Sequence, residues 1–308
     1  MDNEKYKKLV LFLGGLVLLA GCSFPGLASN QSENTVAITG GITTERQIIA
    51  GMVAGMIEHY TDNQTTIINN LGSQNINHEA MMNGDADISG TNYTGTDITT
   101  TLRLPAEKDP DKALEIVQKE FKERYNEEWL DTYGFDNTYV FLVRRDTAEK
   151  YDLEKVSDLE DVADNLTVGA DRAWMTREGD GYPGFIEEYG FEFDSILPMQ
   201  IGLVYDAVAA NRMDVVLGYS TDGRIASYDL VMLDDDRNYF PPYDASPTID
   251  GKLAESDPEV KDALERLTGK IDTETMQKLN YQSDNNLVEP TIVAERFLDQ
   301  NGYFEEEE

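Results

Sequence analysis

Tyrosines stand where the sequence predicts strand ends and extended crossovers. Tyr93 and Tyr219 each follow a short apolar run and are themselves followed by hydroxyl side chains. Tyr139 and Tyr243 lie in the two segments predicted to cross between sheets. In open α/β sheets, ligands bind beyond the carboxyl ends of the strands, so such side chains are placed to line a site. One tyrosine at such a position is more often part of a core, and it is the recurrence that favours a site.

Phenol rings gathered in a cleft suit one kind of ligand in particular, a quaternary ammonium ion. This cation cannot donate a hydrogen bond, and its diffuse charge is attracted to aromatic faces by about 0.5–2 kcal/mol per ring. Four rings therefore suffice for micromolar affinity, which corresponds to about −8 kcal/mol. Tyrosine serves better than phenylalanine because its hydroxyl can bond at the wet rim.

Two segments of similar pattern would position Tyr93 and Tyr219. Residues 78–96 are HEAMMNGDADISGTNYTGT and residues 205–223 are YDAVAANRMDVVLGYSTDG. Each predicts a helix, a turn, an aspartate, a short strand, then a tyrosine and a hydroxyl. We infer two similar βα units, each presenting a tyrosine at a strand end.

The order of the remaining elements predicts an α/β fold of two lobes. Strands and helices alternate from residue 35, and the alternation restarts near residue 140. Two extended crossovers, near residues 137–143 and 235–243, would act as hinges that allow closure around a ligand. We expect a clamshell with lobe I at residues 35–138 plus 242–308, and lobe II at residues 139–241.

Individual elements follow from hydrophobic periodicity and capping signals. Thr44 and Gln47 fit a capping box at the start of a helix. The predicted strands are residues 35–39, 65–68, 140–143, 166–169, 215–217 and 230–233, and the predicted helices include residues 112–129, 156–162, 205–211, 259–268, 272–279 and 291–300.

The N-terminal segment predicts export and a lipid anchor. Three lysines precede an apolar run at residues 9–20, which is the pattern of a secretory signal and is short for a spanning helix. The run ends in Leu-Ala-Gly-Cys, which resembles a bacterial lipobox, and Cys22 is the single cysteine of the chain. Residues 1–22 would be the signal peptide with Cys22 as lipid anchor, and residues 23–34 a tether. We expect the protein to be extracellular, on the outer face of the cytoplasmic membrane.

Composition excludes some partners. The chain has 308 residues, enough for two compact domains, and 40% of them are hydrophobic. Its 59 acidic against 25 basic residues give a net charge of −34. Nucleic-acid binding depends on Lys and Arg neutralising phosphates, so this charge argues against it. Solubility in salty surroundings explains the charge better than steering of ligands, because the Debye length falls to about 3 Å near 1 M salt.

Longer motifs identify a family. The stretches NYTGT, YGFDNTYVFLV, MQIGLVYDAV, GYSTDGRIASYDLVMLDDD, FPPYDASP and GKIDTETMQKLNY closely resemble the substrate-binding lipoproteins of osmoprotectant ABC importers of the OpuB/OpuC type. The resemblance covers essentially the whole mature chain. It implies a type II periplasmic-binding-protein fold, a monomer, a permease and an ATPase as partners, and glycine betaine, carnitine or choline as ligand.

The resemblance also implies site residues. Asn137 of FDNTY would contact the polar tail of the ligand, and Thr96 would give a neutral donor for a carboxylate, which favours betaine and carnitine as well as choline. Where the family often has a Gln after the first strand, this chain has Gly41. Backbone N–H groups from Gly41 to Thr44, at a helix start, could bind the anion instead. The implied ligand cage is Tyr93, Tyr139, Tyr219 and Tyr243.

Two other classes of function remain open at this point. An enzyme is disfavoured because His59 and His78 lie in predicted helices, and Ser220 lacks the G-x-S-x-G context of a nucleophile. The acidic run at residues 234–236 is more typical of a solvated turn than of a metal site. No catalytic residue, metal or cofactor is therefore predicted. A lipid-anchored sensory or adhesion module with the same clamshell is the second alternative, although nothing in the chain resembles a repeat or a signalling domain.

Overall fold

A computed structural model of the chain describes residues 35–172, 174–177 and 180–305. The predicted signal peptide, the lipobox with Cys22 and the tether lie outside the described residues. Within these ranges, no helix combines the length and the hydropathy that crossing a membrane requires.

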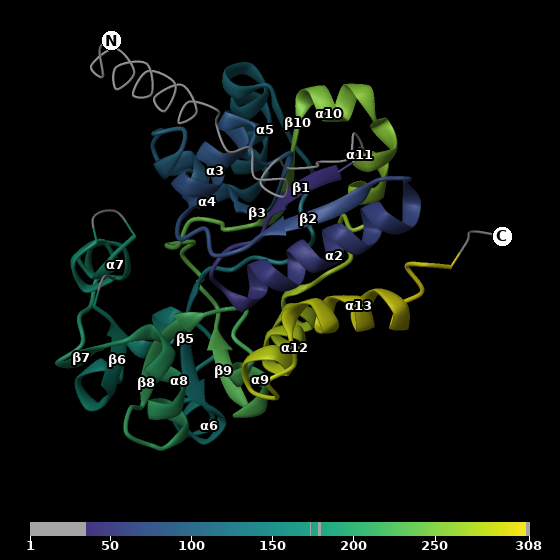
Figure 1. Ribbon diagram of the computed structural model, residues 1–308. Coiled ribbons are helices and arrows are strands. Elements are labelled where there is room, and N and C mark those ends of the chain that lie inside the picture. Colours follow the sequence, from purple (N-terminus) through teal and green to yellow (C-terminus); the bar gives the residue numbers. More distant parts are fainter. Residues whose placement is uncertain (1–34, 173, 178–179, 306–308) are drawn as a thin grey trace, which may run out of the picture. The chain divides into compact units, whose positions relative to one another are not determined.

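The first of two five-stranded mixed sheets has the strand order β2-β1-β3-β10-β4 (Figure 1). Strands β1 and β3 run parallel, and β10 is antiparallel to both β3 and β4. We call the part of the molecule built on this sheet lobe I. Its strands are β1 (Thr35–Thr39), β2 (Gln64–Ile68), β3 (Ile88–Tyr93), β4 (Glu127–Trp129) and β10 (Ala245–Asp250).

Helices cover both faces of this sheet (Figure 1). Helix α2 packs on one face with the C-terminal helices, and a Cβ at its Gly51 would lie 2.9 Å from the Cβ of Ala294 in α13. Glycine therefore permits the two helices to approach closely. The helices of lobe I are α2 (Thr44–Tyr60), α3 (Gln74–Asn83), α4 (Thr94–Thr100), α5 (Pro110–Tyr125), α10 (Gly251–Ser256), α11 (Pro258–Glu265), α12 (Thr273–Asp284) and α13 (Pro290–Gln300).

The second sheet, the centre of lobe II, has the order β7-β6-β8-β5-β9. Strand β6 is parallel to β7 and β8, and β5 is antiparallel to β8 and β9. Its strands are β5 (Tyr139–Arg144), β6 (Thr167–Asp171), β7 (Ser195–Met199), β8 (Val215–Tyr219) and β9 (Leu230–Leu233).

An aromatic core holds lobe II together. Phe141, Trp174 and Phe185 are fully buried and in mutual ring contact. The helices around this core are α6 (Arg145–Tyr151), α7 (Tyr182–Tyr189), α8 (Ile201–Ala209) and α9 (Arg224–Ser227), with 3₁₀ turns η2 (Val156–Leu159), η3 (Ala163–Asn165) and η4 (Trp174–Thr176).

Two crossovers join the sheets, one between β4 and β5 and one between β9 and β10. They run side by side, because Asp136 and Asp244 form an antiparallel bridge and the Asn137 N–H donates to the Tyr243 carbonyl at 3.2 Å. The predicted α/β clamshell with two crossovers is therefore what the chain forms.

The two similar segments of the sequence do form matching units. In one, the Asp87 carboxylate accepts from the Ala37 N–H at 2.8 Å, which ties β3 to β1. In the other, the Asp214 carboxylate accepts from the Thr167 N–H at 2.9 Å, which ties β8 to β6. Each aspartate thus fixes the start of a strand, β3 or β8, that ends in Tyr93 or Tyr219.

Some local predictions were wrong. The helix predicted to reach residue 129 ends at Tyr125, because Asn126 adopts a left-handed conformation (φ 56°) and β4 follows. The predicted capping box does not form either. Thr43 is the N-cap without a side-chain bond, and Thr44 donates instead to Asp284 in α12. In place of the helix predicted at residues 156–162, a 3₁₀ turn forms at Val156–Leu159 only, and residues 160–162 are a turn.

A buried acid lies in β4, the strand that precedes the first crossover. Burial, together with the nearby charges of Asp97 and Asp250, raises the pKa of Glu127 to about 8. His78, whose Nδ1 lies 3.5 Å from Glu127 Oε1, has a pKa lowered by its own burial. Both side chains are therefore held in their neutral forms near neutral pH.

We predict that Glu127 makes the fold less stable as the pH rises. The unfolded chain loses this proton near pH 4.5, whereas the folded chain keeps it until about pH 8, so the free energy of unfolding falls between these values. The full shift corresponds to at most about 5 kcal/mol. In urea unfolding from pH 5 to 9, Glu127→Gln should flatten this decline.

The neighbouring Glu128→Gln is the matched control. The hydrogen bond from Lys261 lowers the pKa of Glu128 below its usual 4.5, so its contribution to stability is lost only in acid and is constant from pH 5 to 9. Glu128→Gln should therefore leave the decline unchanged. If the Glu127→Gln and wild-type curves stay parallel over this pH range, Glu127 is not the source of the decline.

Candidate ligand-binding site

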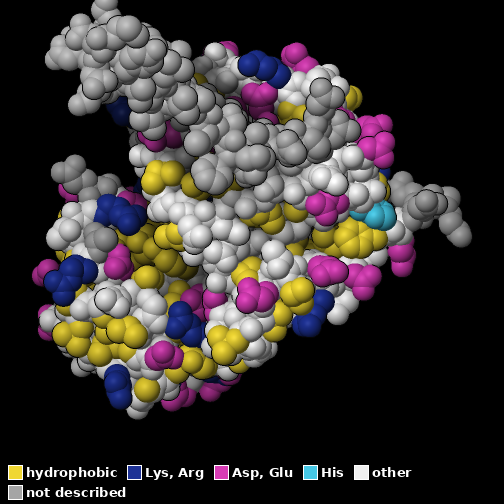
Figure 2. Space-filling view, in the orientation of Figure 1, with side chains coloured by type: hydrophobic (Ala, Val, Ile, Leu, Met, Phe, Trp, Pro, Cys, Tyr) yellow, Lys and Arg dark blue, Asp and Glu magenta, His cyan; other side chains and the backbone are white. Residues whose placement is uncertain are grey.

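A cavity of about 910 Å³ is lined by residues of both lobes. The face of the molecule drawn in Figure 2 has a hollow with hydrophobic side chains gathered along it, while charged side chains are spread over the surrounding surface. Among the predicted site residues, those that line the cavity are Thr44, Tyr93, Thr96, Asn137, Tyr139, Tyr219 and Tyr243.

Gly41 is not among the residues that line the cavity. It is buried behind them, and a Cβ at this position would lie 2.7 Å from the Arg46 side chain. Its carbonyl accepts hydrogen bonds from Gln47 Nε2 and from the Asn70 N–H. The structure thus places Gly41 itself outside the cavity wall, whereas Ile42, Thr43 and Thr44 of the same segment line the cavity. An anion site formed by backbone N–H groups of this segment stays a prediction.

Register pairing brings Tyr139 and Tyr219 together. The two residues are partners in the antiparallel ladder of β5 and β8, and their ring centroids are 5.0 Å apart. The guanidinium of Arg177 lies 5.2 Å from the centroid of Tyr139, and its Nη2 donates to the phenol oxygen at 3.0 Å. The Tyr139 ring thus makes a cation–π contact with Arg177.

Tyr243 is positioned by the crossovers. Its N–H donates to Asp136 Oδ1 at 2.8 Å, and its phenol donates to Asp180 Oδ2 at 3.1 Å. The Gly95 N–H donates to the Pro242 carbonyl at 3.0 Å. A Cβ at Gly95 would lie 2.6 Å from that carbonyl oxygen and 3.3 Å from the Tyr243 ring, so only glycine fits between α4 and this crossover.

Tyr93 is held through a buried carboxylate. Its phenol donates to Glu45 Oε1 at 2.6 Å, and Asn137 Nδ2 donates to the same oxygen at 2.8 Å. The Arg46 guanidinium lies 5.1 Å from the Tyr93 ring centroid and donates to Gln74 Oε1 at 2.9 Å. Glu45, Arg46 and Gln74 all line the cavity, and the sequence analysis identified none of them.

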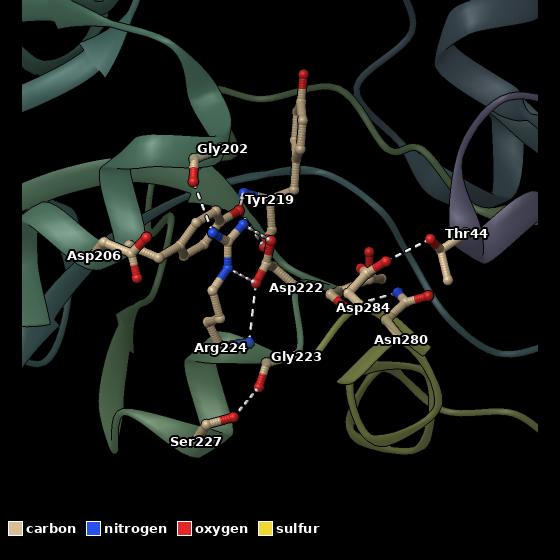
Figure 3. A network of polar contacts seen from close by, with 12 residues as sticks. Thr44, Gly202, Asp206, Tyr219, Asp222, Gly223, Arg224, Ser227, Asn280 and Asp284 are labelled. Atoms are coloured by element: carbon tan, nitrogen blue, oxygen red, sulfur yellow. Dashed lines mark hydrogen bonds and ion pairs between the residues drawn. The ribbon is translucent and has the colours of Figure 1, made fainter. Parts of the chain in front are cut away.

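Helix α12 of lobe I supports the end of β8 in lobe II. Gln277 Nε2 donates to the Ser220 carbonyl at 2.6 Å, and Asn280 Nδ2 donates to the Thr221 carbonyl at 2.9 Å. Figure 3 shows Asn280 and Asp284 on α12, with Thr44 of α2 reaching toward Asp284. These contacts fix the backbone directly after Tyr219 from the opposite lobe.

Several ionisable side chains at the cavity and the crossovers have raised pKa values, which favours their protonated forms. Burial raises the pKa values of Tyr93, Tyr139 and Tyr243, so these hydroxyls remain donors. The pKa of Asp136 is raised to about 7, mainly by burial and to a smaller extent by the charge of the nearby Asp244. Within the described ranges, no three His, Cys, Asp or Glu side chains are arranged to hold a metal ion.

Two α/β lobes, two crossovers and an aromatic cavity between them define the class of two-lobed solute-binding proteins. Comparison with known proteins agrees. Residues 34–300 match the family described as the substrate binding domain of the ABC-type glycine betaine transport system, and the chain belongs to this family. The family consists of transport binding proteins, so the predicted resemblance is confirmed, and a sensory or adhesion module is not favoured.

Individual relatives are similar to this chain in sequence and in structure. The chain is 52% identical over 296 residues to the carnitine transport binding protein OpuCC of Listeria monocytogenes, covering 96% of each chain. It is 29% identical to a glycine-betaine-binding protein of Pseudomonas aeruginosa, covering 91% of each. A crystal structure of a glycine betaine/carnitine/choline ABC transporter matches with a TM-score of 0.85 at 50% identity, covering 88% of this chain and all of that one.

We predict that Gly95→Ala displaces the crossover that carries Tyr243. The added methyl group would collide with the Pro242 carbonyl, and overpacking of this kind costs about 1–3 kcal/mol. The free energy of unfolding should fall by that amount in urea titrations. Gly202→Ala is the control, because a Cβ at Gly202 meets nothing within 4 Å. Equal stability of Gly95→Ala and wild type would contradict the packing described.

Proposed function

We propose that this protein captures glycine betaine, carnitine and choline outside the cell and delivers them to an ABC importer. The observation that carries the proposal is that the four predicted cage tyrosines, which come from two lobes, line one cavity. Family membership supports the transport role. The permease and ATPase of the importer are the partners that this role requires.

The aromatic rings are the proposed contact for the methylated nitrogen. Each ring face contributes about 0.5–2 kcal/mol to binding a desolvated cation. Tyr139 and Tyr219 are already paired, and the hydroxyls of Tyr93 and Tyr243 are bound by carboxylates. Rings that are fixed before binding lose little side-chain entropy when the ligand arrives, which favours affinity.

Polar and cationic groups at the cavity wall are the proposed contacts for the ligand tail. Asn137 Nδ2 donates a hydrogen bond to Glu45, and Asn137 Oδ1 has no partner among the described residues. This oxygen is suited to accept a hydrogen bond from the hydroxyl of choline or carnitine. Thr96 and Thr44 offer hydroxyls. Arg177 supplies positive charge for the carboxylate of betaine or carnitine.

We also propose how the chain is divided into two lobes and an N-terminal anchor segment. Residues 35–138 plus 242–308 would form lobe I and residues 139–241 lobe II, which agrees with the strands of each sheet. Residues 1–22 would be removed or modified on export, with Cys22 as the lipid anchor and residues 23–34 as the tether. The protein would then act as a monomer at the outer face of the cytoplasmic membrane.

We predict that Tyr219→Ala weakens binding of glycine betaine by about 2- to 30-fold, because one face of the proposed cage is lost. Calorimetric titration of residues 23–308 measures this. Tyr228→Ala is the control, since Tyr228 is a half-exposed tyrosine of the same lobe whose hydroxyl bonds Asp206 away from the cavity. Undiminished affinity in Tyr219→Ala would remove this residue from the site.

The same titration with unmethylated glycine tests the proposed ligand class. Glycine has an ammonium group that requires hydrogen-bond acceptors, which aromatic faces do not supply. We expect glycine to bind at least about 100-fold more weakly than glycine betaine. Equal affinities would contradict recognition of the methylated nitrogen by the rings.

We predict that Cys22→Ala releases the exported protein. Without a lipid, nothing else in the described residues has the character of a membrane span. In a bacterial host, the wild-type chain should fractionate with membranes and enter detergent, and the variant should appear in the soluble or secreted fraction. Membrane association of the variant to the same extent would exclude Cys22 as the anchor.

A further inference from the structure

A buried carboxylate lies in the cavity wall beside the tyrosine cage. Glu45, in the first turn of α2, is only 4% exposed and lines the cavity. It accepts hydrogen bonds from Tyr93 and Asn137 on one oxygen and from Asn280 Nδ2, at 3.1 Å, on the other. All three donors are neutral groups, so they orient the carboxyl group and bring no positive charge to it.

The other acidic residues at the cavity differ from Glu45. Asp180 pairs with Arg177 at 3.3 Å, and Asp222 pairs with Arg224 at 2.8 Å (Figure 3). Asp284 is exposed to solvent. Each of these charges is thus compensated by an arginine or by water.

Glu45 has no such compensation within the structure. No Lys, Arg or His nitrogen in the described part of the chain forms an ion pair with it, and its neighbour Arg46 bonds Gln74 and lies over the Tyr93 ring. Buried charges in proteins are normally paired, because removal from water penalises the ionised form. A carboxylate that lines a ligand cavity without a partner is therefore a place for the charge of a cationic ligand.

We propose that Glu45 supplies the counter-charge for the quaternary ammonium group and thereby sets the preference between cationic and zwitterionic ligands. This inference rests on the proposed function. The fixed negative charge attracts choline, which carries only a cation, more strongly than glycine betaine, whose carboxylate it also repels. The hydrogen bond from Tyr93 to Glu45 adds to the effect, since a phenol that donates to a carboxylate has a more electron-rich ring.

The test is the ratio of choline affinity to glycine betaine affinity, measured by calorimetry on residues 23–308. Glu45→Gln should lower this ratio about tenfold relative to wild type. Glu58→Gln removes the same charge from an exposed position on the same helix, outside the cavity lining, and should change the ratio by less than about twofold. Glu45→Asp keeps the charge on a shorter side chain, so its ratio should stay close to wild type even if both affinities fall.

The outcomes separate the two proposals. An unchanged ratio in Glu45→Gln would overturn the role of Glu45, whether both affinities are retained or both are lost together through disturbed packing. A wild-type protein that binds glycine betaine but not choline would overturn it as well. A wild-type protein that binds neither ligand would refute the proposed function itself.

Discussion

The site depends on the backbone pairing of the two crossovers. Asp136 and Asp244 bridge the segments, and the Asn137 N–H bonds the Tyr243 carbonyl. Because Tyr139 begins β5 directly after one crossover and Tyr243 lies near the end of the other, this pairing sets two of the cavity-lining rings relative to each other. The crossovers and the proposed binding site therefore share residues, so a change in one alters the other.

Contacts from the opposite lobe complete the arrangement. Glu45 links the Tyr93 phenol to Asn137 at the first crossover, and Asn280 links Glu45 to the Thr221 carbonyl after β8. A chain of hydrogen bonds thus runs from the Tyr93 phenol of lobe I to the backbone just after β8 in lobe II. Such a chain couples the position of the rings to the closure of the lobes, which is the motion expected of a protein that traps its ligand.

Local sequence patterns predicted the strand ends that carry the tyrosines. They missed the elements and side chains whose positions depend on contacts between residues far apart in the chain. The repeated segments located Tyr93 and Tyr219 because strand, aspartate and tyrosine are close in sequence. Strand β10 was missed, since Pro247 interrupts its pattern and its pairing with β3 and β4 is set by tertiary structure. Glu45 carried no signal, because a carboxylate in a first helical turn is common at exposed N-termini. Its partner Asn280 lies 235 residues away, beyond any local pattern.

The most direct measurement is a crystal structure of the soluble chain with glycine betaine bound. The account predicts that the methylated nitrogen lies within about 6 Å of the ring centroids contributed by both lobes, at the distance that cation–π attraction requires. It also predicts that the lobes are closed over the ligand. A ligand seated elsewhere, or tyrosine rings that turn away from it into the two separate cores, would contradict the account.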